Sequence, residues 1–186
     1  LRGGGGNFGI VTSFTFKGHD VSTIFGGPVL YDIGDTGDVL RWYRDLLPTL
    51  PRDLGGWFAV LTVPPAAPFP EELWGRKACG VVWCYTGDLS KADQVFKPLT
   101  EFGSPILVGV HDMPFPMLQG AFDALYPKGL QWYWRADFFR EITDEAIAQS
   151  RKALARDPQT TSRTCTSRRR TRRAGTMPPG SRRRGR

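Results

Sequence analysis

The sequence predicts an α+β fold, an antiparallel β-sheet with helices on one face, followed by a disordered basic tail. Short runs of β-branched and aromatic residues alternate with amphipathic runs, in the order ββα, ββα, βα, βα. Strand pairs that no helix separates favour antiparallel pairing. From about Arg156 the apolar periodicity stops and Thr, Ser, Arg, Pro and Gly dominate, so this segment cannot form a core.

Six segments have the alternation or the apolar composition of β-strands. In 130–139, Trp132 and Trp134 share one side with other apolar residues, and Tyr133 and Arg135 share the other side. A bulge or bend is expected where Gly26-Gly27-Pro28 interrupts the second segment. The predicted strands are 9–16, 23–31, 56–63, 76–86, 105–111 and 130–139.

Capping residues and apolar spacing predict four helices between and after these strands. Pro48 ends the first helix, and a proline-rich loop at 64–70 separates two of the strands. Asp144 and Glu145 suit the first turn of the last helix because acidic side chains stabilise a helix N-terminus. The helices are expected from Asp35 or Thr36 to about Leu47, from Asp88 to about Leu99, over 117–125, and onward from near Thr143.

Length and composition limit the class of protein. A chain of 186 residues with 40% hydrophobic residues suits one globular domain or a piece of a larger one. No run of 18 apolar residues occurs, so no membrane-spanning helix is predicted. No signal peptide is visible in a chain that opens without Met, and a cytoplasmic location is expected.

The net charge of +7 is unevenly distributed. Residues 156–186 hold eleven Arg, no Lys and one acid, which gives +10, whereas the rest of the chain carries −3. Arginine without lysine is unusual in a phosphate-binding arm, where both residues serve. The composition of this segment indicates that it arises from translation of GC-rich DNA in a shifted reading frame. A disordered linker and a nucleic-acid-binding arm are the alternatives.

Cysteines and histidines form no known metal motif. Cys79 and Cys84 would lie on opposite faces of one strand, which favours buried free thiols, and Cys165 makes the number odd. The two histidines, His19 and His111, form no His-x-x-x-His pair, and they do not fit the sequence order of a Ser-His-Asp catalytic triad. We predict no metal site and a structural or solvent-facing role for His19, with a metal or base role for His111 as the weaker alternative.

The most informative motif is the opening sequence Leu1-Arg-Gly-Gly-Gly-Gly-Asn-Phe-Gly-Ile-Val-Thr12. Gly4-x-Gly6-x-x-Gly9 matches the dinucleotide fingerprint, but that fingerprint requires a helix after it, and here a predicted strand follows. A glycine turn entering a strand can still present backbone N–H and C=O groups to a nucleotide. A tight turn or bulge without a ligand is the equal alternative on the residues alone.

The segment from Leu1 to His19 resembles the motif LRGGGGNFGVVTSFTF-x-x-H of the berberine bridge enzyme-like FAD-linked oxidases. These enzymes belong to the vanillyl-alcohol oxidase / p-cresol methylhydroxylase superfamily. The similarity continues more loosely to about residue 150, through Gly27-Pro28-Val29-Leu30-Tyr31, Trp42-Tyr43-Arg44-Asp45 and Tyr133-Trp134-Arg135-Ala136-Asp137-Phe138.

The resemblance implies a domain organisation. Residues 1–17 would end an FAD-binding domain, 18–155 would form the α+β substrate domain whose sheet faces the flavin, and 156–186 would be the tail. The family's main FAD-binding region lies upstream of the motif, and a C-terminal segment returns to the flavin. The sequence therefore resembles the central fragment of such an oxidase, and we expect the chain to be inactive alone.

The resemblance also implies the cofactor and its contacts. FAD would be contacted by backbone atoms around Gly6, Asn7, Gly9, Ile10 and Val11. The flavin would accept a hydride from a small organic substrate and be reoxidised by O₂. The catalytic base and the identity of the substrate remain open.

The 130–139 strand offers two candidate substrate residues. Tyr133 could hydrogen-bond the substrate, and Arg135 could hold an anionic group. A solvated or helix-covered face with an Arg135–Asp137 ion pair is the favoured alternative. Two other functions stay open for the whole chain, nucleic-acid binding through the arginine tail and a ligand-free α+β interaction module.

Overall fold

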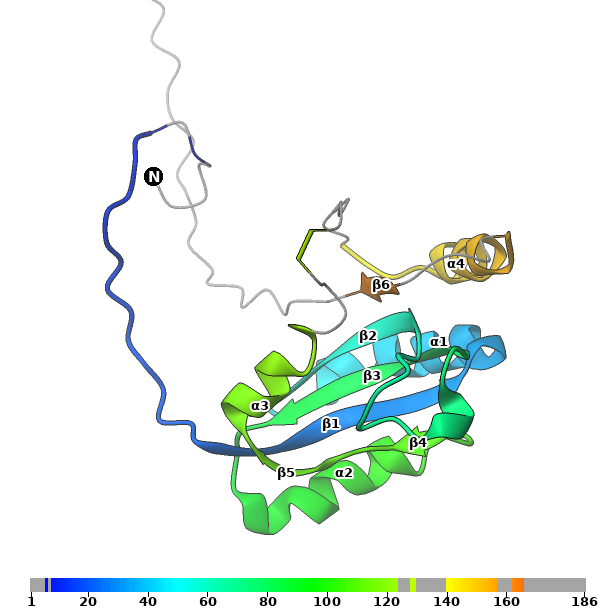
Figure 1. Cartoon of the computed structure of the whole chain (residues 1–186), viewed down its shortest axis with the longest axis horizontal. Coiled ribbons are helices and arrows are strands. Elements are labelled where there is room, and N and C mark those ends of the chain that lie inside the picture. Colours follow the sequence, from blue (N-terminus) through cyan, green and yellow to red (C-terminus); the bar gives the residue numbers. More distant parts are fainter. Residues whose placement is uncertain (1–5, 7, 124–127, 130–139, 157–161, 166–186) are drawn as a thin grey trace, which may run out of the picture.

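The computed structural model describes residues 6, 8–123, 128–129, 140–156 and 162–165, and it confirms the predicted α+β fold with an antiparallel sheet (Figure 1). The strands are β1 (Thr23–Asp32), β2 (Leu54–Thr62), β3 (Lys77–Tyr85), β4 (Leu107–Val108), β5 (His111–Pro114) and β6 (Ser162–Cys165). The α-helices are α1 (Thr36–Leu46), α2 (Ala92–Thr100), α3 (Phe115–Gly120) and α4 (Asp144–Arg156). Short 3-10 turns are Ile33–Asp35, Leu47–Thr49, Glu71–Leu73 and Leu89–Lys91.

The sheet has the strand order β4-β1-β3-β2-β6, and β5 also pairs with β1. The long strands β1, β3 and β2 form its centre, because β3 pairs along its length with both neighbours. All the pairs are antiparallel. Of the two strand pairs predicted without an intervening helix, β2 with β3 forms as expected, whereas β1 pairs with β3 and not with 9–16.

The irregularity expected at Gly26-Gly27-Pro28 appears in the edge neighbour of β1 and not in the pairing of β1 with β3. β1 keeps an unbroken register with β3, whereas its other neighbour is divided into β4 and β5 opposite Gly27 and Pro28. Gly27 has φ +135°, and a Cβ atom there would collide with the carbonyl oxygen of Gly109. Glycine is needed at this position because side chains rarely adopt that φ and no space exists for one.

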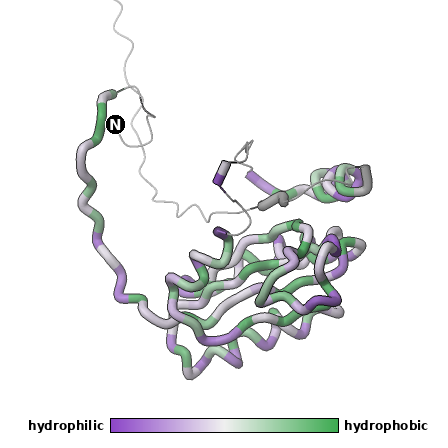
Figure 2. The backbone as a smooth tube through the Cα atoms, viewed as in Figure 1, coloured by the Kyte–Doolittle hydropathy of each residue, from purple (hydrophilic) through white to green (hydrophobic). Residues whose placement is uncertain are grey.

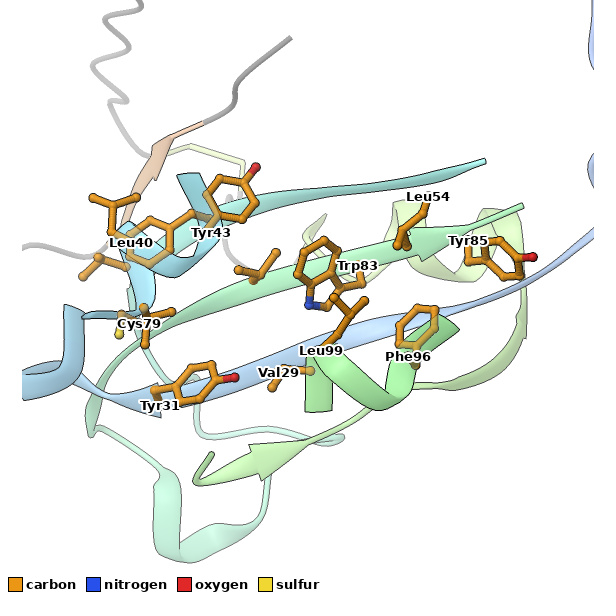
Figure 3. Close-up of a cluster of buried hydrophobic side chains, with 14 of the residues drawn as sticks. Val29, Tyr31, Leu40, Tyr43, Leu54, Cys79, Trp83, Tyr85, Phe96 and Leu99 are labelled. Carbon is orange, nitrogen blue, oxygen red and sulfur yellow. The ribbon is translucent and has the colours of Figure 1, made fainter. Parts of the chain in front are cut away.

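One face of the sheet, the α1 face, carries the main core. It is formed by alternate residues of the central strands, including Val29, Val81, Trp83 and Phe58, all of which are buried. Side chains from three helices pack against them: Val39, Leu40 and Tyr43 of α1, Ala92, Phe96 and Leu99 of α2, and Ile147 of α4 (Figure 3). Three of the four predicted helices therefore share this face, as expected.

The opposite face, the α3 face, is covered by smaller clusters. Leu118 of α3 packs with Ile24, Val82 and Met113. At the other end of the sheet, the segment after β2 contributes Val63 and Leu73, which pack with buried residues of the strands. The short α3 thus lies on the face that the prediction left without a helix, because its apolar residues extend an apolar cluster that begins in β1, β3 and β5.

Two helix starts differ in detail from the prediction, because a 3-10 turn precedes each helix. The carboxylate of Asp88 accepts a hydrogen bond from the backbone N–H of Ser90 at 3.1 Å, so it caps the 3-10 turn Leu89–Lys91 and not α2, which begins at Ala92. The carboxylate of Asp35 caps nothing at the start of α1. Instead, Asp32 Oδ1 accepts from Gly34 N–H at 2.9 Å, because a 3-10 turn precedes the helix.

The structure differs from the prediction at several of the expected strands. Residues 9–16 are not a strand, because no described segment pairs with them and a strand exists only through its partner. The 105–111 segment is divided between β4 and the first residue of β5, and 130–139 lies outside the described residues. No structure was predicted after Arg156, yet β6 pairs with β2 there, since backbone groups at a sheet edge accept a strand whatever its side chains.

Candidate functional site

The candidate site begins at an extended segment, Gly6 and 8–20, called here the N-terminal arm. Figure 2 shows its apolar stretch standing away from the sheet. Ile10 is 95% exposed and Phe16 is 80% exposed, and no backbone hydrogen bond joins the described part of the arm to the sheet. The large apolar side chains exposed here are Phe8, Ile10, Val11, Phe14 and Phe16.

A row of exposed apolar side chains of this kind is unusual on a folded protein and marks an interaction surface. Phe14 and Phe16 stack with their ring centroids 5.6 Å apart, because residues two apart in an extended chain project to the same side. These two rings therefore share one side of the arm.

Four of the five predicted cofactor residues lie exposed in this arm. They are Gly6, Gly9, Ile10 and Val11, whereas Asn7 lies outside the described residues. Gly9 has φ +126°, a conformation that favours glycine, and a Cβ at Gly6 or Gly9 would meet nothing within 4 Å. The backbone of these residues is open to close approach by a flat or anionic group.

The two predicted substrate residues, Tyr133 and Arg135, lie outside the described residues, as does the aromatic side formed by Trp132 and Trp134. They remain predictions. The arginine-rich segment lies outside as well, apart from β6 and the end of α4.

The two histidines are far apart in the fold. His19 is exposed in the N-terminal arm, in agreement with a solvent-facing role. His111 is exposed at the start of β5, with its Nδ1 atom 3.3 Å from the carbonyl oxygen of Gly109. In the part of the chain that the structure describes, no group of three or more His, Cys, Asp or Glu side chains could hold a metal ion.

Cys79 and Cys84 are free thiols and lie on opposite faces of β3, as predicted. Cys79 is buried in the α1 face, and Cys84 is half-buried in the α3 face. Burial raises the pKa of Cys79 to about 11 and raises that of Cys84 as well. Both thiols are protonated near pH 7, and a thiol is a poor nucleophile, so neither suits covalent catalysis.

An ion pair joins α4 to α1. Arg44 of α1 donates to Asp144 at 2.7 Å and to the carbonyl of Ile142 at 3.2 Å. The guanidinium of Arg44 lowers the pKa of Asp144. These contacts join two helices at the surface and form no pocket for a ligand.

Sequence reasoning missed a polar feature of the core. The hydroxyl of Tyr31 and the indole nitrogen of Trp83 are buried, and neither has a hydrogen-bond partner in the described structure. The sequence predicts that both residues lie in strands. Whether a buried polar atom finds a hydrogen-bond partner depends on which helices pack over those strands. A pattern of residue types could not have shown this.

The described helices include none long and apolar enough to span a bilayer. No model of a known protein family matches the chain. A comparison with curated proteins does find a relative, an FAD-linked oxidoreductase of Dictyostelium discoideum.

The chain is similar to that FAD-linked oxidoreductase. The two are 26% identical over 143 residues, which is 76% of this chain and 28% of the relative. The chain therefore spans little more than a quarter of the curated protein that it matches. The similarity supports a relationship with FAD-linked oxidoreductases in general, and it does not single out the berberine bridge enzyme-like enzymes.

Proposed function

We propose that this chain is part of an FAD-dependent oxidoreductase of the berberine bridge enzyme-like type, chiefly its substrate domain. The observation that carries the proposal is the glycine-rich arm, whose sequence resembles the family motif and which leads directly into an antiparallel sheet backed by helices. The similarity to an FAD-linked oxidoreductase over 143 residues supports it.

The residues of the arm fit a flavin cofactor. Gly6 and Gly9 leave the backbone open on both sides, so its N–H and C=O groups can reach a ring edge or a phosphate. Ile10 and Val11 are exposed and apolar, and they can cover a planar ring. With Asn7, these are the residues that would hold FAD.

In the proposed enzyme the bound flavin supplies the redox chemistry, taking a hydride from a small organic substrate and being reoxidised by O₂. This chain would provide the surface that orients the substrate and excludes water. The α1 face is filled by helices, so we propose that the cofactor lies over the α3 face, which smaller clusters cover and where Trp57 and Ala59 are only half-buried. Tyr133 and Arg135 are proposed to bind the substrate.

The test is expression of the complete open reading frame that contains this chain. The product is expected to purify with flavin absorbance and to lose that absorbance when a substrate reduces it. Gly9→Val should weaken flavin binding by about tenfold, or about 1.4 kcal/mol, because a branched side chain cannot adopt φ +126°.

The matched control is Gly55→Ala, since a Cβ atom at Gly55 meets nothing within 4 Å and the residue lies in β2, away from the arm. It should bind flavin as the unmodified protein does. A complete product that binds no flavin would overturn the proposal.

A further inference from the structure

The two edges of the sheet are built differently. The edge beside β1 consists of two short strands, β4 and β5, which are interrupted at Gly109 and Val110. β5 also contains the acidic residue Asp112 and the proline Pro114. Short strands, charged residues and prolines are features by which proteins prevent a sheet edge from pairing with another chain, so this edge is protected.

The opposite edge, formed by β2, lacks those features. β2 is nine residues long, and its sequence Leu-Gly-Gly-Trp-Phe-Ala-Val-Leu-Thr contains no charged residue and no proline. A long and uncharged edge strand is a template on which another strand can add. The β2 edge therefore needs a cover if the chain is to stay a monomer.

The register of the central strands shows which residues of β2 face outward. A Cβ atom at Gly26 would collide with the carbonyl oxygen of Trp83, so Trp83 directs its backbone groups toward β1. The register partner of Trp83 in β2 is Gly56, which therefore directs its own N–H and C=O groups away from β3. Because this direction alternates along a strand, Phe58 and Val60 also present their backbone groups at the outer edge.

Different groups cover these outward positions. The carbonyl oxygen of Gly56 accepts a hydrogen bond from the hydroxyl of Tyr43 in α1 at 2.8 Å. Phe58 and Val60 face β6, which lies beside β2 (Figure 1). Among the described strands, β6 is the one that pairs with this side of β2, so the cover of the second half of the edge depends on it.

β6 is a small cover for so long a strand. It has four residues, and its register sets Arg163 opposite Val60 and Cys165 opposite Phe58. Since Val60 and Phe58 face outward, the backbone N–H groups of Arg163 and Cys165 face β2, whereas that of Thr164 faces away. The attachment of β6 therefore depends on the backbone groups of two residues.

We propose that the β2 edge is a site at which two copies of this chain associate, and that β6 blocks it. Two β2 strands can pair antiparallel about a two-fold axis at Ala59, because an edge is then complementary to itself. Phe58 of each copy lies opposite Val60 of the other, and pairs of an aromatic with a β-branched residue stabilise antiparallel strands. β2 carries no charge that would oppose this contact, and the bond from Tyr43 to Gly56 confines the pairing to the half that β6 covers.

The test is the double variant Arg163→Pro, Cys165→Pro in the whole 186-residue chain. Proline has no backbone N–H, so both donors that face β2 are lost and β6 leaves the edge. The dimer dissociation constant, measured by sedimentation equilibrium, should fall at least about tenfold relative to the unmodified chain, because the edge is then open.

The matched control is Thr164→Pro, whose N–H faces away from β2. Proline is tolerated in an edge strand at such a position, so β6 should stay in place and this variant should associate as the unmodified chain does. The control also accounts for association through the N-terminal arm, which all three chains share.

Hydrogen exchange locates the contact. In the unmodified chain, β6 should protect the amides of Phe58 and Val60 at every protein concentration. In the double variant, these amides should exchange rapidly in dilute solution and become protected as the concentration rises, while the amides of β3 stay protected throughout and report a folded sheet. A double variant that stays monomeric, or a dimer in which Phe58 and Val60 exchange equally fast at all concentrations, overturns the proposal.

Discussion

Gly80 illustrates how single residues shape this sheet. It stands in the middle of the apolar strand β3, where a larger residue would be the ordinary choice. A Cβ atom at Gly80 would collide with the carbonyl oxygen of Val29 in the neighbouring strand, and it would lie 2.9 Å from the Cα of Leu30. The two strands approach closely at this point, and only glycine permits it.

We expect Gly80→Ala to lower the free energy of unfolding by about 1–3 kcal/mol, because backbone atoms of β1 must move to admit the methyl group. Denaturant unfolding measures the change. Gly55→Ala, at the exposed start of β2, serves as the control and should stay within about 0.5 kcal/mol of the original. Equal effects at the two glycines would show that close approach is not the reason for Gly80.

The sequence indicated other single residues correctly. Cys79 and Cys84 were predicted on opposite faces of a strand, because their spacing along the strand decides this. Asp35 does not cap α1, and Asp88 caps only the 3-10 turn before α2, because the chain makes a 3-10 turn before each helix, a detail that no local pattern specifies.

At the scale of elements, α4 depends on a small number of contacts. Ile147 is its fully buried residue, and Arg44 holds Asp144 at the beginning of the helix. The helix packs mainly on α1, where the side chain of Arg151 lies over Gly37. Its amphipathic spacing and its acidic first turn predicted the helix, but only the tertiary structure shows that α1 is its support.

Ile147→Ala should therefore cost about 2–5 kcal/mol of stability, since it opens a cavity between α4 and the core. Hydrogen exchange is expected to show faster exchange in α4 than in β1, β2 and β3. Ile10→Ala, which removes the same atoms from a side chain that is 95% exposed, should change stability by less than about 0.5 kcal/mol. Unchanged protection of α4 in the Ile147 variant would contradict this account.

At the scale of the whole molecule, the chain consists of a packed sheet domain and an arm that is not part of its core. The arm carries five large apolar side chains in the open, whereas the sheet buries both of its faces to a large extent. An arm with this composition is expected to contribute to binding, and not to the stability of the sheet.

Deletion of residues 1–19 should leave the midpoint of thermal unfolding unchanged, because the described part of the arm pairs with no strand. It should also reduce self-association at high concentration, since it removes Phe8, Ile10, Val11, Phe14 and Phe16. Calorimetry and light scattering measure the two effects. A longer deletion that ends at Gly26 is the control and should lower the midpoint, because it removes part of β1; a similar drop for both deletions would mean that the arm stabilises the sheet.

The sequence by itself determined the α+β class, the central strands, and the extent of α1 and the start of α4 within a few residues, because these follow from periodicity and capping over short distances. It placed the start of α2 four residues too early and extended α3 five residues past Gly120. The sequence also contains the glycine-rich motif of the N-terminal arm, on which the proposed function rests. Only the tertiary structure decided that 9–16 pairs with none of the described strands, that α3 covers the second face, and that β6 joins the edge of β2. These features depend on which distant segments meet, and so do the unpaired polar atoms of Tyr31 and Trp83, which no local pattern records.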